Sequence, residues 1–260
     1  MRLLCVVPFA FLQLALAGAL APPPNASPGG ALPAIPAKEA LNYSVEWRLV
    51  HAGNARLNWS ASDAGRPGWQ SNMYLESIGL VSKLFKVNNS YNDAFDGGMC
   101  VQKTLFDINE GSRKREVAVT FDTRHKKAHF IERDLAKNQT VADAEIDTQA
   151  CEHDIIGALY ELRTMNVEIG HSVGIPVSDG KKSVVVRVQA EERETIKTDW
   201  GTYNTIRYEA FVFDGVVYRR SGKAFVWLTD DNRRLPVQIR VRLPIYIGTV
   251  TLQLENPGKK

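Results

Sequence analysis

Hydrophobic and polar residues alternate along most of the chain after residue 40. Polar residues separate Leu41, Tyr43, Val45, Trp47 and Leu49. In a β-strand this period of two puts every second side chain on one face, so the segment predicts a strand with a buried face and a wet face. Similar runs recur at residues 55–61, 117–121, 184–188, 237–243 and 250–254.

Residues that favour turns separate these runs. We expect a turn at Ala52-Gly53 and tight hairpin turns at Asp96-Gly97, Asp179-Gly180 and Asp214-Gly215, because such pairs tolerate a positive φ. The runs between turns predict about ten to twelve strands. Clean alternation in consecutive hairpins is typical of antiparallel pairing.

Two segments have helical spacing instead. Residues 154–165 predict a helix, with Asp154 at its positive end and Arg163 at its negative end. Its expected buried stripe is Ile155, Ala158, Leu159, Leu162 and Met165. A shorter helix is predicted over residues 79–85. The whole pattern predicts a mainly β protein: one large curved antiparallel sheet, a half-open barrel, with one covering helix near residues 154–165.

The first 37 residues have a different composition. Arg2 precedes an apolar stretch that ends in small residues near Ala21, which is the order of an export signal. We predict a signal peptide over residues 1–19, cleaved after Ala17 or Ala19; an uncleaved membrane anchor is the alternative. A Pro- and Gly-rich tether follows over residues 20–37, and a single β-rich domain over residues 38–257.

Charge and cysteine content narrow the class of protein. Lys plus Arg number 32 and Asp plus Glu 29, so the balance does not favour a nucleic-acid partner. No segment after the signal approaches the length of a transmembrane helix. Cleavage removes Cys5 and leaves Cys100 and Cys151, which in an exported protein predict one disulfide; two buried thiols are the alternative.

The sequence contains none of the common catalytic motifs that we considered, neither a nucleophile elbow nor a phosphate-binding loop. Ser178 and Lys181 match S-x-x-K, but they span a predicted turn. His125 and His129 are better explained as surface residues, because a strand separates such positions by about 13 Å. We therefore expect no enzyme, no cofactor and no metal site. An unrecognised hydrolase that uses Glu191, Asp231 or His153 remains an alternative.

Large apolar residues on the inner face of a curved sheet form either a packed core or the wall of a hydrophobic cavity, and both readings stay open. On the cavity reading, the short helix over residues 79–85 acts as a lid. The predicted ligand-binding residues are then Tyr43, Trp47, Trp59, Trp69, Met73, Leu84 and Phe85.

Several segments together resemble a bacterial envelope family that is catalogued as domain-of-unknown-function family 3108. They are residues 41–55, 154–163, 199–203, 226–237 and 248–254, and the resemblance covers about residues 41–255. Members are typically exported from Gram-negative cells, which implies a periplasmic location. The family has no established activity, so the resemblance implies no catalytic residues.

These observations define the expected function. We expect an exported, periplasmic, non-enzymatic protein that binds an apolar or lipid-like ligand, or an acyl chain or peptide of an envelope partner, in its curved sheet. The predicted outline is similar to the half-open barrels of periplasmic lipoprotein carriers, a likeness of fold alone. The alternative is a structural or assembly factor of the envelope that acts through protein–protein contacts.

Overall fold

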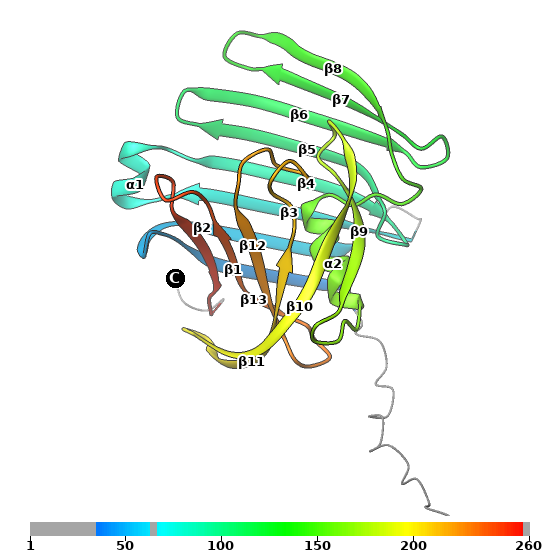
Figure 1. Cartoon of the computed structure of the whole chain (residues 1–260). Helices are drawn as coiled ribbons and strands as arrows, with labels where there is room; N and C mark the ends of the chain where they lie inside the picture. Colours follow the sequence, from blue (N-terminus) through cyan, green and yellow to red (C-terminus); the bar gives the residue numbers. More distant parts are fainter. Residues whose placement is uncertain (1–34, 63–66, 257–260) are drawn as a thin grey trace, which may run out of the picture. The chain divides into compact units, whose positions relative to one another are not determined.

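Antiparallel strands dominate the computed structural model, which describes residues 35–62 and 67–256 (Figure 1). The predicted signal peptide and most of the predicted tether lie outside these residues. The described helices are α1 (Gly79–Leu84) and α2 (Ile155–Thr164). The described strands are β1 (Lys38–Trp47), β2 (Val50–Ala61), β3 (Gly68–Ser77), β4 (Asn88–Asp96), β5 (Val101–Glu110), β6 (Arg113–Asp122), β7 (Lys127–Asp134), β8 (Gln139–Asp147), β9 (Ser172–Ser178), β10 (Ser183–Thr198), β11 (Gly201–Ala210), β12 (Lys223–Thr229), β13 (Pro236–Arg242) and β14 (Thr249–Leu254).

All the strands of the described residues belong to one curved sheet. Its order is β8-β7-β6-β5-β4-β3-β2-β1-β14-β13-β12-β11-β10-β9, with antiparallel neighbours throughout. The first strand thus pairs with the last in the middle of the sheet, and the described pairing leaves β8 and β9 as its two edges. The connection that contains α2 joins these edges. The predicted mainly β, half-open architecture is confirmed, with more strands than expected.

Alternation in β1 and β2 builds the inner face as predicted, but one turn was misplaced. Leu41, Tyr43 and Val45 are buried, and Tyr43 pairs with Ala55 across the two strands. The reversal lies at Arg48-Leu49, and the prediction of a turn at Ala52-Gly53 was wrong. Gly53 lies inside β2, where a Cβ would collide with the backbone oxygen of Glu76. This glycine permits close strand approach rather than a turn.

The remaining predicted turns agree better with the structure. Asp96-Gly97 connects β4 to β5, and Asp179-Gly180 connects β9 to β10. Asp214-Gly215 also forms a tight turn, with φ of 57° and 91°, but inside a longer connection between β11 and β12. The β9–β10 turn packs across the sheet, because a Cβ at Gly180 would collide with the side chains of Val119 on β6 and Phe130 on β7.

Helix α2 fills the concave side of the sheet. The Tyr160 ring stacks on the buried Trp59 ring at 3.8 Å between centroids and 12° between planes. The predicted stripe is only partly right, because Ile155 is exposed whereas Ile156, Tyr160 and Arg163 are buried. Two apolar clusters contact α2, one containing Trp59 and Tyr160 and the other containing Leu162 and Val177. The helix is therefore buried on two sides rather than along one stripe.

A buried ion pair anchors the end of α2. Arg163 lies in the last turn of α2, as predicted, and it is buried. It donates to both carboxylate oxygens of Glu39 on β1, at 2.6 and 2.9 Å, and to the carbonyl oxygen of Arg233 at 3.2 Å. The Tyr160 hydroxyl donates to the same carboxylate at 2.9 Å. Bidentate geometry of this kind compensates the cost of burying both charges.

The other end of α2 contains two buried carboxyl groups. Asp154 caps the helix by accepting a 2.6 Å hydrogen bond from the Gly157 amide. Asp93 on β4 accepts a 2.7 Å hydrogen bond from the Ser71 hydroxyl and also bonds the Asp154 carboxyl. Burial, reinforced by the Asp154 charge, raises the pKa of Asp93 to about 9. Asp93 thus stays protonated at neutral pH and donates to Asp154.

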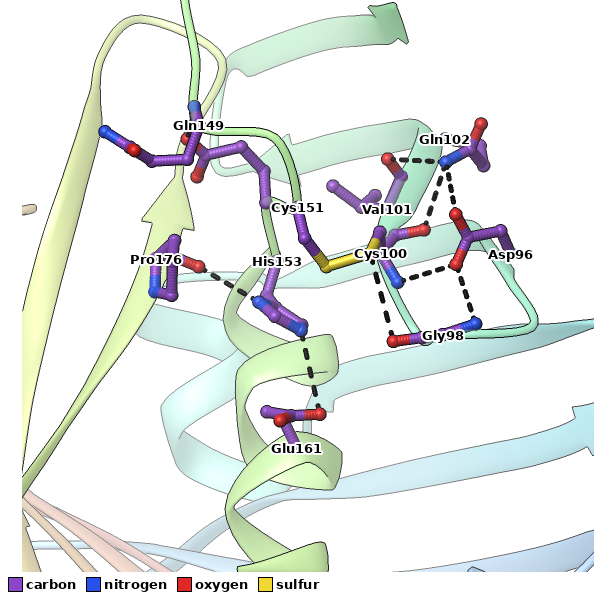
Figure 2. Close-up of a disulfide and its surroundings, with 11 residues drawn as sticks. Asp96, Gly98, Cys100, Val101, Gln102, Gln149, Cys151, His153, Glu161 and Pro176 are labelled. Atoms are coloured by element: carbon purple, nitrogen blue, oxygen red, sulfur yellow. Dashed lines mark hydrogen bonds and ion pairs between the residues drawn. A yellow bond between two sulfur atoms is a disulfide. The ribbon is translucent and has the colours of Figure 1, made fainter. Parts of the chain in front are cut away.

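A disulfide ties the α2 connection to the sheet (Figure 2). It joins Cys100, just before β5, to Cys151, just before α2, with 4.9 Å between the Cα atoms. The pairing agrees with the prediction. The Val101 amide donates to the carbonyl oxygen of Glu152 at 2.8 Å, which continues the attachment along the backbone. The edge-to-edge connection is therefore held to β5 at two adjacent points.

Candidate functional site

The predicted ligand-binding residues separate into three places. Tyr43 and Trp59 are buried in the core, with Trp69 and Met73 packed against them. Trp59 contacts Trp69, Phe95 and Tyr160, so aromatic rings occupy the space beside it. Among these residues the inner face is packed, with α2 where a ligand was expected.

The other predicted residues lie at one end of the sheet. Trp47, the last residue of β1, donates through Nε1 to the carbonyl oxygen of Ile247 at 2.7 Å. Leu84 and Phe85 lie on and directly after α1, where both are exposed. The structure does not bring these two side chains to the Trp59 cluster.

The three candidate hydrolase residues each have their own structural partners. Glu191 pairs with Arg207, and Asp231 with Arg233 and Thr229. His153 is buried before α2 and bonds the carbonyl oxygen of Pro176 through Nδ1 at 3.1 Å (Figure 2). In the S-x-x-K segment, the Lys181 ammonium lies 3.0 Å from Glu132, and the Ser178 hydroxyl donates to the carbonyl oxygen of Lys182. Each of these side chains thus has separate local partners, and the structure does not bring them together at one site.

A groove, which we call the arginine groove, lies where β1, β13 and β14 end. Its volume is about 770 Å³. The outer faces of β13 and β14 form the floor, because Arg240 pairs with Thr251 and Arg242 with Thr249. The two neighbouring turns, at residues 48–49 and 243–248, form the walls. The lining residues used below are Glu46, Arg48, Leu49, Arg240, Arg242 and Ile245.

Arg48 fastens the two walls together. Its guanidinium donates to the carbonyl oxygens of Ile245 and Tyr246, at 2.8 and 2.7 Å. A Cβ at Gly248 would collide with the Arg48 side chain, so the glycine makes room for this contact. Because carbonyl groups are neutral, they hold the guanidinium in place without cancelling its charge.

Arg240 and Arg242 leave the floor of the groove positive. Neither guanidinium forms a salt bridge with a carboxylate in the described part of the chain; instead they lie over the rings of Trp227 and Phe225, at 5.1 and 5.2 Å. Partial burial and the nearby Arg242 charge lower the pKa of Arg240, against weaker opposing effects of the Glu194 and Glu46 carboxylates. Two adjacent guanidinium groups stacked on aromatic rings fit a bidentate anion such as a phosphate or carboxylate.

The walls of the groove present apolar side chains to solvent. Leu49 is 93% exposed and Ile245 is 92% exposed. Arg48 and Leu49 both have positive φ, 51° and 66°, a conformation that only glycine adopts without a steric cost. The turn closes the β1–β2 hairpin, but the Leu49 side chain that it displays is not buried in the core. The groove therefore combines a cationic floor with apolar walls.

Sequence reasoning missed this site. It placed Leu49 inside a strand and treated Arg240 and Arg242 as the wet face of another strand. The missed signal was the pair Arg240-x-Arg242 followed closely by Ile245-Tyr246. Spacing of two puts both arginines on one face, and an apolar pair in a turn has no core to enter.

Two structural findings bear on other kinds of function. In residues 35–62 and 67–256, no group of three His, Cys, Asp or Glu side chains is placed to hold a metal ion. The helices described there are also too short or too polar to cross a membrane.

Comparisons with known proteins found two solved structures and one family, and the first structure supports the fold. A solved β-barrel-like protein of DUF1849 from Brucella abortus superposes with a TM-score of 0.52 at 8% identity, over 87% of this chain and 98% of the other. A DUF1089 protein from Pseudomonas aeruginosa matches with a TM-score of 0.31 at 11% identity, over 85% and 96%. The comparison with curated proteins found no match. A family of proteins of unknown function, DUF3108, matches residues 42–255, so this chain belongs to the DUF3108 family.

Proposed function

We propose that this protein is an exported, non-enzymatic binding protein of the bacterial envelope that takes an anionic, lipid-like ligand in the arginine groove. One observation carries the proposal: Arg240 and Arg242 have no carboxylate partner among the described residues, while Leu49 and Ile245 beside them face solvent. The arginines match an anionic headgroup, and the apolar walls match the first part of an acyl chain.

The size and position of the groove support this ligand class. A volume of about 770 Å³ is within the range of small-molecule sites, roughly 300–1,000 Å³. The concave face is packed by α2 and Trp59, so the ligand lies at the end of the curved sheet rather than inside it. Long acyl chains extend beyond the groove, along the exposed side chains of its walls.

Export is supported by two independent features of the chain. The first 21 residues have the charge, apolar core and small residues of a signal peptide. The Cys100–Cys151 disulfide is the kind of bond that persists in an oxidising compartment such as the periplasm. Expression in a Gram-negative host tests this part: the periplasmic fraction should contain a chain that begins near residue 18 or 20.

Calorimetric titration tests the ligand class. The probes are palmitoyl-lysophosphatidylglycerol, which is anionic, and palmitoyl-lysophosphatidylcholine, which is zwitterionic, both below their micelle concentrations. We expect the anionic probe to bind at least tenfold more tightly, because both probes carry a phosphodiester but only choline adds a positive charge, which the two guanidinium groups repel. Equal affinities, or no binding, would refute the proposal.

Matched variants locate the binding. Arg240→Gln with Arg242→Gln removes both charges from the floor and should weaken binding of the anionic probe at least tenfold. Arg56→Gln is the control, because Arg56 lies on β2 outside the groove, where its guanidinium donates to the Asn42 amide oxygen at 3.1 Å. Arg56→Gln should bind like the natural protein; a loss of the same size there would mean that only net charge matters.

The alternative, an assembly factor, rests on the two sheet edges. β8 has a strand partner on one side only in the described sheet, whereas His153 bridges the second side of β9 through backbone hydrogen bonds with Pro176 and Ser178. However, β8 has Asp143, Glu145 and Asp147 along its length, and edge charges of this kind discourage the addition of a further strand. Crosslinking from β8 in cells tests this alternative, which requires a protein partner at that edge.

A further inference from the structure

Helix α1 does not contribute to the core. Leu80 is 69% exposed, Leu84 is 74% exposed, and Phe85 directly after the helix is 53% exposed. No residue of α1 is buried. A helix of a globular protein ordinarily packs its apolar side against the core, so these side chains have no explanation in folding. Exposed apolar groups gathered on one short element indicate an interaction surface.

The ends of α1 are fixed even though its apolar side is free. The Ile78 amide before the helix donates to the carbonyl oxygen of Ala52 on β2 at 2.8 Å. After the helix, the Val87 amide donates to the Ser77 hydroxyl at 2.8 Å. The Gly111 amide donates to the carbonyl oxygen of Lys86 at 2.8 Å. The helix is thus presented in a defined orientation by the strands beneath it.

The charges around α1 indicate which partner fits. Residues 78–87 contain Lys83 and Lys86 and no Asp or Glu. An apolar segment that carries two lysines and no carboxylate of its own complements an anionic bilayer, where apolar groups enter the interface and lysines meet phosphates.

The position of α1 places it near the arginine groove. Ile78 is bonded to Ala52, and the turn at Arg48-Leu49 directly precedes that part of β2. Figure 1 shows α1 at the same end of the sheet as the connection between β1 and β2. Leu49 and Val50 are themselves exposed there. The apolar residues of α1 and of this turn therefore extend from the same end of the protein.

We propose that α1 and the β1–β2 turn form a docking surface for an anionic bilayer, in which Leu80, Leu84 and Phe85 enter the interface and Lys83 and Lys86 bind lipid phosphates. This proposal deepens the proposed function. It rests on that function in one respect, the idea that docking brings the groove to its ligand. Its own evidence is the exposure and charge of α1.

Sedimentation with lipid vesicles tests the docking surface in the mature full-length chain. Vesicles of phosphatidylethanolamine and phosphatidylglycerol should bind the protein, and vesicles of phosphatidylcholine should bind it at least tenfold less. Leu84→Ser with Phe85→Ser should reduce binding to the anionic vesicles at least tenfold, because each large side chain gains tenfold or more on entering an apolar phase. Lys83→Glu with Lys86→Glu should reduce it similarly.

The control variant is Trp200→Ser. Trp200 is an exposed aromatic residue in the β10–β11 turn, at the opposite end of the strands from the groove. It should bind vesicles like the natural protein. A loss as large as that of the α1 variants would overturn the proposal, and so would α1 variants that sediment like the natural protein.

Lysophosphatidylglycerol titration of the same variants separates the two proposals. The α1 variants should keep the affinity of the groove for this probe while they lose vesicle binding. If they keep vesicle binding and instead release the probe faster, α1 is a lid and the docking proposal is wrong. If the natural protein binds vesicles but not the probe, the proposed function fails and the docking surface stands.

Discussion

The interior and the arginine groove use the same residue type in opposite ways. Arg163 is 1% exposed and binds both oxygens of the Glu39 carboxylate. Arg240 and Arg242 instead lie over aromatic rings and have no carboxylate partner among the described residues. A guanidinium that is already paired holds the fold together, whereas one that is only stacked leaves its hydrogen-bond donors available.

Apolar residues differ between the two regions in the same way. Trp59 contacts three aromatic rings in the interior, but Leu49 and Ile245 face solvent at the groove. Burial in the core explains why Trp59 is apolar, but it does not explain the apolar side chains of Leu49 and Ile245. The contrast predicts that changes in the interior affect stability and changes at the groove affect binding.

The largest expected effect comes from breaking the interior ion pair. Arg163→Ala leaves the Glu39 carboxylate buried and unpaired, which typically costs about 3–5 kcal/mol of unfolding free energy. Urea denaturation measures the change. Arg240→Ala, the matched arginine of the groove, should cost about 1 kcal/mol or less. Equal losses for both variants would contradict the distinction between paired and stacked arginines.

Removal of the disulfide tests whether the two regions are independent. Cys100→Ser with Cys151→Ser opens a connection between residues 51 positions apart, and the expected loss of unfolding free energy is about 2–4 kcal/mol. Affinity for lysophosphatidylglycerol should not change, because the bond attaches α2 to β5 and does not touch the groove. A parallel loss of affinity would show that the groove depends on how α2 is held.

The Asp93–Asp154 pair predicts a pH dependence of stability. The pKa of Asp93 is raised to about 9 in the folded protein, above an unfolded value of about 3.9. Between these values the folded state holds the extra proton, so the stability that this group contributes is complete below pH 4 and is lost as the pH rises to 9. Asp93→Asn keeps a hydrogen-bond donor for Asp154 but removes the carboxyl group that titrates.

Thermal unfolding across pH measures this effect. The advantage of Asp93→Asn over the natural protein should grow with pH and reach about 4 °C or more at pH 8. Some pH dependence should remain, because burial raises the pKa of Asp154 as well. A constant difference between the two proteins from pH 5 to pH 8 would mean that Asp93 is ionised in the fold.

The smallest expected change is a gain of stability at the groove. Leu49→Gly removes a leucine from a positive φ of 66°, which should raise the unfolding free energy by about 0.5–1 kcal/mol. The same change removes an apolar wall of the groove and should weaken binding of the lysolipid. A variant that is less stable would show that the leucine supports the fold.

The sequence predicted the features of the fold that depend on local patterns of residues. Period-two alternation identified the β architecture, and the spacing in residues 154–165 identified α2. The features that the sequence did not predict depend on contacts between residues far apart in the chain. Arg163 is buried because it pairs with Glu39, and residue 53 is glycine because a Cβ there would collide with the backbone of Glu76. The groove was missed for the same reason, because the contact between Arg48 and Tyr246 spans 198 positions.

The position of β1 between β2 and β14 has a consequence for the order of folding. Ser44 and Gln253 meet across these strands although they lie 209 positions apart in the chain. Such long-range pairing forms slowly. The sheet is incomplete until the final strand has been synthesised, because β1 lacks one of its neighbours. A nascent chain of this design therefore retains an unpaired edge on β1, at the centre of the sheet, until β14 is available.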